Sequence, residues 1–425
     1  MASTTGRSRL ENSDIRMTAE QETPSIETTS DSQSEILLSA VMPCLNEAET
    51  IGTCVKKAMN CIHSMDIAGE VIVADNGSTD GSQDIARRYG ARVVNVPYRG
   101  YGAALTAGFQ AARGKIIVMA DSDCSYDWEA MGPLVAKVQE GNELVMGNRF
   151  KGGIKPGAMP VLHRYLGNPV LSFLGRLFFK TNVGDFHCGM RAFARESILK
   201  LNLQTSGMEF ASEMVVKAAL HNLRITEVPV VLSPDGRSRR PHLRTWRDGW
   251  RHLRFLLLYS PRWLFLFPGL ILFLLGILGM LTVGRHSITI DGFGLDIHTL
   301  AYAGASITLG MQMIFFSIFT KLLGQRIGWL PRDEKLEKLT NKITLETGLI
   351  FALILFLTGL WLTWRAFDGW SSTGFSNLDP RITMRTVIPA VTAMTLSGEI
   401  ALGAFFLEAV RIQQSHSDSN SPGIK

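Results

Sequence analysis

Short apolar runs alternate with helix-like stretches through the first half of the chain. Five runs rich in Val, Ile and Leu predict strands, at 36–42, 70–74, 92–96, 115–120 and 143–146. Stretches with helical spacing lie between them and predict helices, at 48–62, 80–89, 102–113 and 128–140. Strands separated by helices of this length are typical of parallel crossovers, so the pattern predicts an α/β domain over residues 35–235. Ligands of such sheets bind at the carboxyl ends of the strands.

The second half of the chain carries long apolar runs that a soluble domain of this size does not need. They predict four membrane-spanning helices, at about 263–284, 299–320, 347–364 and 386–407. The first two each run 22 residues without a charge, which is enough to cross a hydrocarbon core of ~30 Å. The sequence therefore predicts an α/β domain followed by an all-α transmembrane helix bundle over residues 263–410, with a C-terminal tail at 411–425.

The first 34 residues are rich in Ser, Thr, Glu and Gln and have no apolar core of the kind that a signal peptide needs. They predict a disordered N-terminal tail. The five cysteines show no paired spacing, which favours a reducing compartment over a disulfide framework. Lys and Arg number six in 321–346, one in 285–298 and three in 365–385. This bias predicts an integral multi-pass membrane protein whose α/β domain lies in the cytoplasm.

The net charge of +5 is concentrated in one segment, 236–262, where eight arginines stand against a single carboxylate, Asp248. Such a cluster is compatible with nucleic acid, but its position just before an apolar span favours lipid headgroups or phosphates. We therefore expect the lipid bilayer, and no nucleic acid, as a partner. Trp246, Trp250, Leu253 and Leu257 share one face at helical spacing. An ordinary surface helix has the same pattern, but its position favours a helix in the headgroup plane.

The clearest chemical motif is Asp121-Ser122-Asp123, which directly follows a predicted buried strand. Side chains at i and i+2 point the same way if the strand continues, and two like charges that close need a positive partner. A divalent cation that bridges a diphosphate satisfies both, and hard carboxylate oxygens suit Mg²⁺ or Mn²⁺. The alternative is a surface turn that happens to be acidic.

Polar residues follow two other predicted strands. Asp75 ends the second one, where a carboxylate can accept hydrogen bonds from a base or a ribose. Asn46 and Glu47 follow the first strand and, taken alone, could merely cap a helix. Glu399 interrupts the fourth span, where it either bonds a neighbouring helix or takes part in headgroup passage.

These pieces occur in a familiar order. The segments NEAETI, VADNGSTDGS, RGYGAALTAGFQAARG and MADSD together resemble the catalytic domain of glycosyltransferase family 2, which has the Rossmann-like GT-A fold. The later segments GNR, GDFHCGMRAF and MEFASEM resemble its polyprenyl-phosphate branch, which includes dolichol-phosphate mannose and glucose synthases. The resemblance covers about residues 36–255. One departure is Ser125, which stands where many members carry a further metal ligand, Gln or His.

The resemblance implies roles for residues that the pattern alone does not assign. The nucleotide would be held by Pro43, Asn46, Glu47 and Asp75. The metal and the diphosphate would meet Asp121 and Asp123. Acidic positions beside the sugar would be Asp185 and Glu213, and phosphates of the donor or acceptor would meet Arg149 and Arg191. A basic segment that closes over the site would include Arg237 and Arg239.

The implied enzyme is a metal-dependent hexosyltransferase. It would move mannose or glucose, with inversion, from a GDP- or UDP-sugar to a polyprenyl or dolichyl phosphate at the cytoplasmic membrane face. One alternative is a membrane glycosyltransferase that acts on a glycan hydroxyl in polysaccharide synthesis, although the chain lacks the QxxRW motif of processive synthases. A second alternative is a non-catalytic membrane scaffold.

Overall fold

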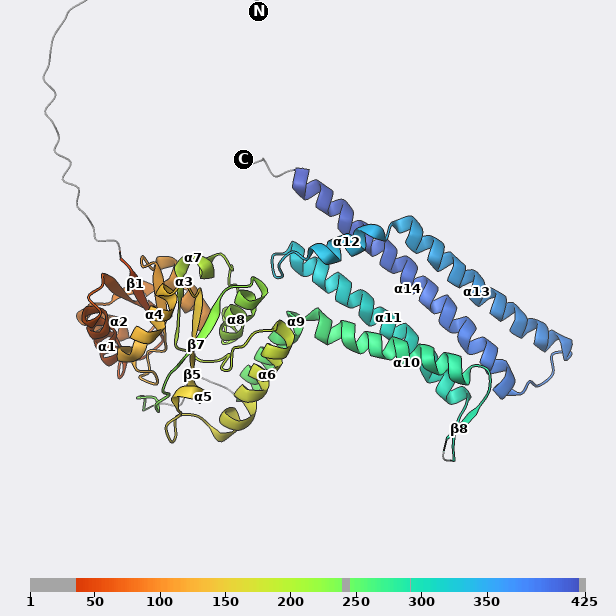
Figure 1. Cartoon of the computed structure of the whole chain (residues 1–425), viewed down its shortest axis with the longest axis horizontal. Coiled ribbons are helices and arrows are strands. Elements are labelled where there is room, and N and C mark those ends of the chain that lie inside the picture. Colours follow the sequence, from red (N-terminus) through yellow and green to blue (C-terminus); the bar gives the residue numbers. More distant parts are fainter. Residues whose placement is uncertain (1–35, 239–244, 291, 420–425) are drawn as a thin grey trace, which may run out of the picture. The chain divides into compact units, whose positions relative to one another are not determined.

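A computed structural model describes residues 36–238, 245–290 and 292–419 of the chain. Its α/β part is built on a seven-stranded sheet with the order β3-β2-β1-β4-β6-β5-β7 (Figure 1). The strands are β1 Leu38–Cys44, β2 Gly69–Asp75, β3 Arg92–Asn95, β4 Ile116–Met119, β5 Leu144–Asn148, β6 Arg191–Ala194 and β7 Ile225–Pro229. β1 pairs in parallel with both β2 and β4, so the carboxyl ends of these three strands meet at one edge.

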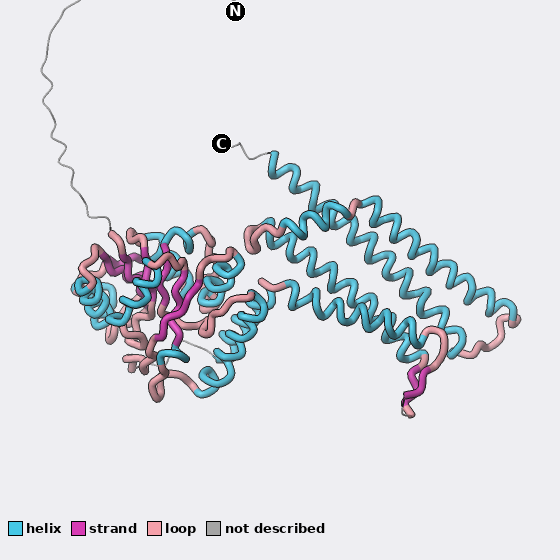
Figure 2. Tube along the Cα trace, viewed as in Figure 1, coloured by secondary structure: helices cyan, strands magenta, loops and turns pink. Residues whose placement is uncertain are grey.

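Helices cover both faces of this sheet (Figure 2). They are α1 Ile51–Ser64, α2 Ser82–Arg88, α3 Tyr101–Ala111, η1 Trp128–Met131, α4 Gly132–Gln139, α5 Arg149–Gly152, η2 His163–Gly167, α6 Asn168–Phe179, α7 Arg195–Leu199, α8 Phe210–Leu220 and α9 Thr245–Leu258. The expected helix over 128–140 is thus a short turn, η1, followed by α4.

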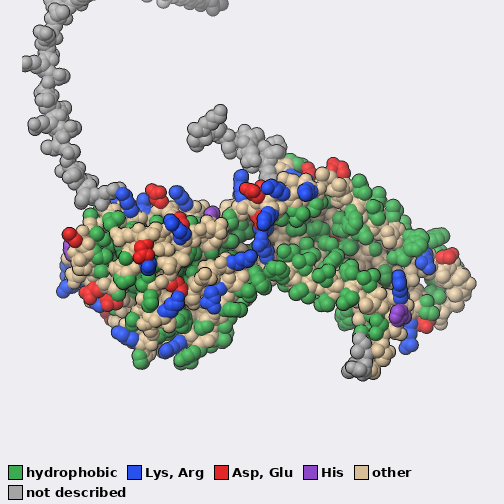
Figure 3. Space-filling view, viewed as in Figure 1, with side chains coloured by type: hydrophobic (Ala, Val, Ile, Leu, Met, Phe, Trp, Pro, Cys, Tyr) green, Lys and Arg blue, Asp and Glu red, His purple; other side chains and the backbone are tan. Residues whose placement is uncertain are grey.

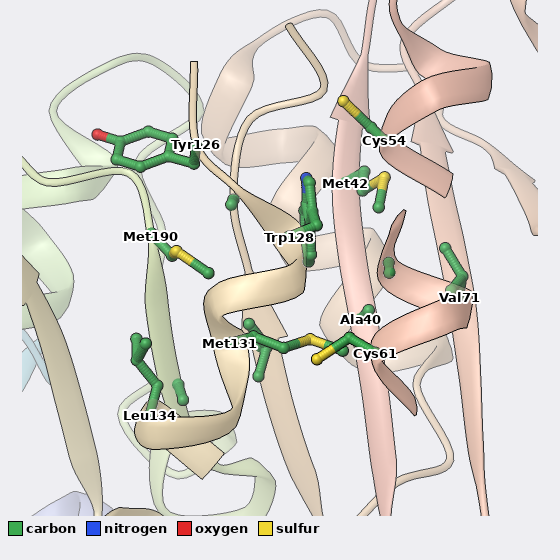
Figure 4. Packing of buried hydrophobic residues seen from close by; sticks show 14 of the residues in the cluster. Ala40, Met42, Cys54, Cys61, Val71, Tyr126, Trp128, Met131, Leu134 and Met190 are labelled. Atoms are coloured by element: carbon green, nitrogen blue, oxygen red, sulfur yellow. The ribbon is translucent and has the colours of Figure 1, made fainter. Parts of the chain in front are cut away.

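Strand alternation divides the buried side chains into two cores. Ala40 and Met42 of β1 pack with α1 and with Trp128 on one face, as Figure 4 shows. Val41 of the same strand points to the other face, where it joins the core that contains Phe109 of α3 and Phe210 of α8. Because successive strand residues point to opposite faces, a strand covered on both sides reads as a continuous apolar run.

The five strands expected from the sequence are confirmed, but the sheet is mixed rather than wholly parallel. β6 runs antiparallel between β4 and β5, and β7 extends the sheet beyond β5. Neither strand was predicted. β6 is only four residues long and begins with Arg191, while β7 contains Glu227 and ends in Pro229, so both lack the apolar run that marks a central strand.

Helix α9 is apolar on two sides. Trp246 and Trp250, on the face expected from the sequence, are 80% and 58% exposed. The opposite face buries Phe255 and Leu256 in the core that contains Phe210. The amphipathic pattern thus describes one side of α9, and the other side belongs to the α/β domain.

The C-terminal part is helical, with η3 Arg262–Leu266, α10 Phe267–Val283, α11 Ile297–Arg326, α12 Glu334–Lys342, α13 Leu345–Ser372 and α14 Pro380–Ser419. A hairpin of β8 Ile288–Ile290 and β9 Phe293–Leu295 joins α10 to α11. Within the described residues, four helices are long and apolar enough to cross a membrane. Hydrophobic side chains cover much of their surface (Figure 3).

α11, α13 and α14 are longer than their expected spans, whereas η3 and α10 together cover 22 residues, the length expected for the first span. α13 has 28 residues, and α14 begins at Pro380 and continues into the segment that the sequence suggested was a tail. The apolar run marks the part of a helix that lies in hydrocarbon, whereas helical backbone continues into the polar flanks. Ion pairs lie near the helix ends. Asp333 pairs with Arg262 and Lys321, and Asp296 pairs with Arg385.

Glycines let these helices approach closely. α11 packs against α10 and α14, and α14 also packs against α13. A Cβ atom on Gly310 of α11 would lie 2.6 Å from the backbone nitrogen of Phe273 and 2.7 Å from the carbonyl oxygen of Gly269, both on the α10 side. Small residues at such crossings are the usual basis of helix association in membranes.

We therefore expect Gly310→Ala to destabilise the detergent-solubilised protein by about 1–3 kcal/mol, because the added methyl group overpacks a backbone contact. Gly369→Ala in α13 is the matched control, since nothing lies within 4 Å of a Cβ atom there. Thermal unfolding of both variants measures the difference. Equal midpoints would contradict the close α10–α11 packing.

Candidate active site

The loops after β1, β2 and β4 come together at the carboxyl edge of the sheet. Asp75 is the last residue of β2 and pairs in register with Cys44 at the end of β1. Ser122, between the two aspartates that follow β4, donates a hydrogen bond of 2.6 Å to the carbonyl of Pro43 in β1. The sheet order thus gathers residues from three distant parts of the sequence.

The two carboxylate oxygens of Asp75 differ in their hydrogen bonds. Its Oδ2 accepts hydrogen bonds from the backbone nitrogens of Gly77 and Ser78, each 3.0 Å away, and from Nε2 of Gln83 at 2.6 Å. Its Oδ1 is buried and has no hydrogen-bond partner among the described residues. A buried acceptor without a partner is costly, so this oxygen is suited to a donor on a bound ligand.

The loop after β1 is tied to the loop after β2. Asn46 adopts a left-handed conformation, with φ of 58°, and its Oδ1 accepts from the backbone nitrogen of Thr79 at 2.8 Å. Asp80 Oδ2 accepts from the nitrogen of Ala48 at 2.9 Å. Neither Asn46 nor Glu47 caps α1, since Thr50 stands at its N-cap position. These hydrogen bonds hold the two loops together. A role for Asn46 and Glu47 as helix caps does not account for them.

Asp121 and Asp123 lie beyond the end of β4, which stops at Met119, so an extended strand does not orient them. The pKa of Asp121 is raised to about 7, first by burial and then by the neighbouring charge of Asp123. Asp123 is 8% exposed, and its Oδ1 accepts from the backbone nitrogen of Ser125 at 3.0 Å. The site therefore holds two acids that resist being charged together.

Arg237 supplies positive charge to this pair. Its guanidinium lies 2.6 Å from Oδ2 of Asp123, 3.0 Å from Oε1 of Glu47 and 3.1 Å from Oδ2 of Asp235. One arginine thus joins the loop after β1, the loop after β4 and the segment around Gly236. Arg239, expected to act with it, lies outside the described residues.

Arg149 and Asp185 form a closed pair. The guanidinium Nε and Nη2 of Arg149 each lie 2.7 Å from a different oxygen of Asp185, which is wholly buried. This planar bidentate pairing engages both oxygens of Asp185 and two of the five N–H donors of the guanidinium. In this arrangement Arg149 and Asp185 neutralise each other, and the contact of Arg149 with a phosphate and the position of Asp185 beside the sugar stay predictions.

Arg191 and Glu213 also bond to other parts of the α/β domain. Arg191 has no exposed surface, and its three guanidinium nitrogens donate to the carbonyls of Cys188, Ala211 and Phe186. Glu213, equally buried, pairs with Lys217 at 2.8 Å and accepts from the backbone of the loop before α8. Internal partners occupy both side chains in this structure, and the roles expected for Arg191 at a phosphate and for Glu213 beside the sugar stay predictions.

Two stretches of the chain match models of known families. Residues 39–201 match glycosyl transferase family 2, and residues 318–411 match the glycosyltransferase family 2 C-terminal transmembrane region. The low-salt glycan biosynthesis hexosyltransferase Agl6 of Haloferax volcanii is 35% identical over 385 residues, which cover 89% of this chain and 90% of that protein. The chain belongs to glycosyltransferase family 2.

Shorter likenesses concern the catalytic half of this family-two glycosyltransferase. The dolichyl-phosphate hexose transferase of Haloferax volcanii is 31% identical over 193 residues, 45% of this chain and 81% of that protein. A crystal structure of glucosyl-3-phosphoglycerate synthase from Mycobacterium tuberculosis with Mg²⁺ and uridine diphosphate is 26% identical. That alignment covers 53% of this chain and 80% of that one, with a TM-score of 0.42. Membership of family 2 identifies the α/β domain as a GT-A domain, and a matched family 2 transmembrane region follows it.

Sequence reasoning missed three residues that shape the acidic pair of this family-two enzyme. A Cβ atom on Gly189 would lie 2.6 Å from Oδ2 of Asp121, so only glycine lets the loop before β6 approach that carboxylate. The hydroxyl of Tyr126 accepts from the nitrogen of Gly189 at 2.8 Å, and the hydroxyl of Tyr101 bonds to Asp121. Of the three, only Tyr101 stands out in the sequence, because it lies between two glycines.

The raised pKa of Asp121 predicts a pH-dependent stability. Its folded pKa of about 7 exceeds the ordinary 3.8, so the folded state binds the proton more tightly and loses stability as pH rises from about 4 to 7. Without divalent metal, we expect neutral Asp121→Asn to raise the unfolding temperature more at pH 8 than at pH 5. Thermal unfolding in chelator measures this.

The matched control for that comparison is Asp84→Asn, because the side chain of Asp84 is 77% exposed on α2. Its effect should be similar at pH 5 and pH 8. A stabilisation by Asp121→Asn that is equal at both pH values would contradict the raised pKa of Asp121.

Proposed function

We propose that the enzyme transfers a hexose, with inversion, from a GDP- or UDP-sugar to a polyprenyl phosphate at the cytoplasmic membrane face. The product would be a lipid-phosphate sugar. One observation supports a lipid phosphate as the acceptor. Asp185 and Glu213, the carboxylates expected beside the sugar, are both buried and paired with a basic side chain. Such groups are poorly placed to take a proton from an acceptor.

A hydroxyl acceptor needs a base, and a positioned base typically contributes about a hundredfold or more. A lipid monophosphate needs none, because its second pKa is near ~6 and it is largely dianionic at neutral pH. Its oxygen would attack the anomeric carbon as the bond from that carbon to the nucleoside diphosphate breaks. The engaged acids therefore favour a phosphate over a glycan hydroxyl, the acceptor in polysaccharide synthesis.

The nucleotide sugar would bind at the carboxyl edge of the sheet. Oδ1 of Asp75 is a buried acceptor that suits a donor group of the base or ribose. Pro43, Asn46 and Glu47 line the adjoining loop, which is fixed to the loop after β2. The scaffold alternative is disfavoured by these groups, since a non-catalytic domain has no need to keep a buried carboxylate oxygen without a partner among the described residues, or an acidic pair in which burial and the neighbouring charge raise the pKa of Asp121.

Asp121 and Asp123 fit a divalent cation. Among the described residues, no group of three or more His, Cys, Asp or Glu side chains has metal-binding geometry. Mg²⁺, however, is commonly held by one or two carboxylates together with substrate phosphates. The two aspartates would hold Mg²⁺ or Mn²⁺ in that way, and the ion would neutralise the leaving diphosphate. Ser125 supplies its backbone nitrogen to Asp123, so the usual further ligand is absent at that position.

The lipid phosphate would approach along α9, the segment that precedes the membrane helices. Trp246 and Trp250 of α9 are exposed, and Arg247 and Arg251 lie beside them on the same helix. Amphipathic aromatic and basic side chains suit the headgroup region of a bilayer, where a polyprenyl phosphate presents its charge. This surface is close in sequence to η3, which begins the first membrane helix.

We expect transfer of labelled hexose to polyprenyl phosphate and none to free polyprenol, because only the phosphate is a nucleophile without a base. The measurement incubates the solubilised enzyme with a panel of labelled nucleotide sugars and each lipid, then separates the lipids. The labelled product should release free sugar in mild acid. An acid-resistant product with a glycosidic bond to another sugar would assign the enzyme to polysaccharide synthesis.

Asp123→Asn supplies the control for that assay. It removes a carboxylate from the acidic pair and should abolish nearly all transfer, whereas Asp84→Asn on α2 should leave it unchanged. If Asp123→Asn kept more than about a tenth of the activity, a loss below ~1.4 kcal/mol in transition-state stabilisation, the metal-binding assignment would be wrong.

The cytoplasmic orientation is a separate proposal, supported by the bias of Lys and Arg toward 321–346. We expect Thr289→Cys, in β8, to react with an impermeant thiol reagent from outside intact cells. Lys338→Cys, in α12, should react only after the cells are permeabilised. Both positions are exposed, so accessibility within the protein does not bias the comparison. The reverse pattern would place the catalytic domain away from cytoplasmic nucleotide sugars.

A further inference from the structure

Two cysteines meet directly beside the acidic pair. Sγ of Cys54, in α1, lies 3.5 Å from Sγ of Cys124, which follows Asp123 in the chain. The remaining cysteines have other surroundings. Cys44 Sγ lies 3.8 Å from the hydroxyl of Ser78, Cys61 Sγ donates to the carbonyl of Glu129, and Cys188 is wholly buried. Cys54 and Cys124 therefore form a thiol pair distinct from the other three.

The pair is close enough to be joined without rebuilding the domain. A disulfide has an S–S length of about 2.05 Å, so the two sulfur atoms would have to approach by about 1.5 Å. Cys124 lies in a loop and has φ of 64°, in the left-handed region that a non-glycine residue occupies at some cost. A small shift of this loop, rather than of α1, would close the distance.

A cavity gives small molecules access to both sulfurs. It has a volume of about 310 Å³ and is lined by Cys54, Lys57, Cys124, Tyr126, Lys155 and Ser233, among others. Cys54 is almost wholly enclosed by the core, but Cys124 keeps part of its surface. A peroxide is much smaller than this space, so Cys124 is the sulfur that it would reach first.

The Cys124 loop carries the functional site. The carbonyl of Asp123 accepts from the nitrogen of Gly236 at 2.8 Å, and the carbonyl of Ser125 accepts from the nitrogen of Ser233 at 2.9 Å. Arg237, one residue beyond Gly236, pairs with the Asp123 carboxylate. A displacement of Cys124 would therefore move Asp123 together with the segment that holds Arg237.

We propose that Cys54 and Cys124 form a reversible disulfide that lowers the activity of the enzyme when a hydroperoxide is present. The Cys124 sulfur attacks the peroxide, its S–O bond forms as the O–O bond breaks, and an alcohol or water leaves. The Cys54 sulfur then displaces water from the resulting sulfenic acid, which closes the S–S bond. Two thiols are oxidised and one peroxide is reduced, and a dithiol reverses the change by exchange.

Thiol counting in denaturant tests the bond without reference to sugar transfer. The reduced full-length protein has five free thiols, and brief treatment with hydrogen peroxide should leave three. Mass spectrometry of proteolytic peptides should find Cys54 joined to Cys124. Transfer activity should fall about tenfold or more, since misplacing reactive groups by ~1 Å can cost a hundredfold, and a dithiol should restore it.

Two variants separate this switch from general oxidation. Cys54→Ser should keep its basal activity, lose the reversible inhibition and form no disulfide. Cys61→Ser, two turns further along α1, should respond to peroxide like the unaltered protein. A joined peptide that involves other cysteines, five thiols after treatment, or a Cys54–Cys124 bond with unchanged activity would each overturn the proposal.

Discussion

Three carboxylates and one guanidinium meet at the carboxyl edge of the sheet. Glu47, Asp123 and Asp235 come from three separate segments, and Arg237 touches all of them. Acids held this close repel one another unless a cation lies among them, so this contact decides how the loops around the site are arranged. In this arrangement the arginine supplies the positive charge that the acids require. A metal ion that bound Oδ2 of Asp123 would compete with Arg237 for that oxygen.

Two further pairs of buried charged residues neutralise each other. Arg149 with Asp185, and Lys217 with Glu213, are buried pairs in which each charge has a partner and further hydrogen bonds. Burying such pairs adds little net stability, but removal of one partner typically costs about 3–5 kcal/mol. The two pairs hold the loops before β6 and α8, and the loop before β6 also contains Gly189, which lies close to Asp121.

The sequence predicted the features that follow from local pattern. Short apolar runs located five strands, the resemblance predicted the GT-A domain, and long apolar runs located the four helices that are apolar enough to cross a membrane. The pattern could not reveal β6, because a four-residue strand that begins with a buried Arg191 has no apolar signature. The pattern also could not show which acidic side chain each arginine pairs with. Arg149 and Arg237 look alike in a sequence, and only the positions of Asp185 and Asp123 show that one is enclosed and the other faces the acidic pair.

Helix α9 bears on how far the two parts of the protein are separable. Its Phe255 and Leu256 complete a core that also contains Phe210 and Met214, although its tryptophans face outward. A polypeptide that stopped before Thr245 would keep the whole sheet and every residue of the acidic site, yet it would leave that core open to water. Such a polypeptide would tend to aggregate through the uncovered apolar surface. The shortest catalytic unit able to remain soluble would therefore carry a helix with exposed tryptophans, and with it an affinity for lipid.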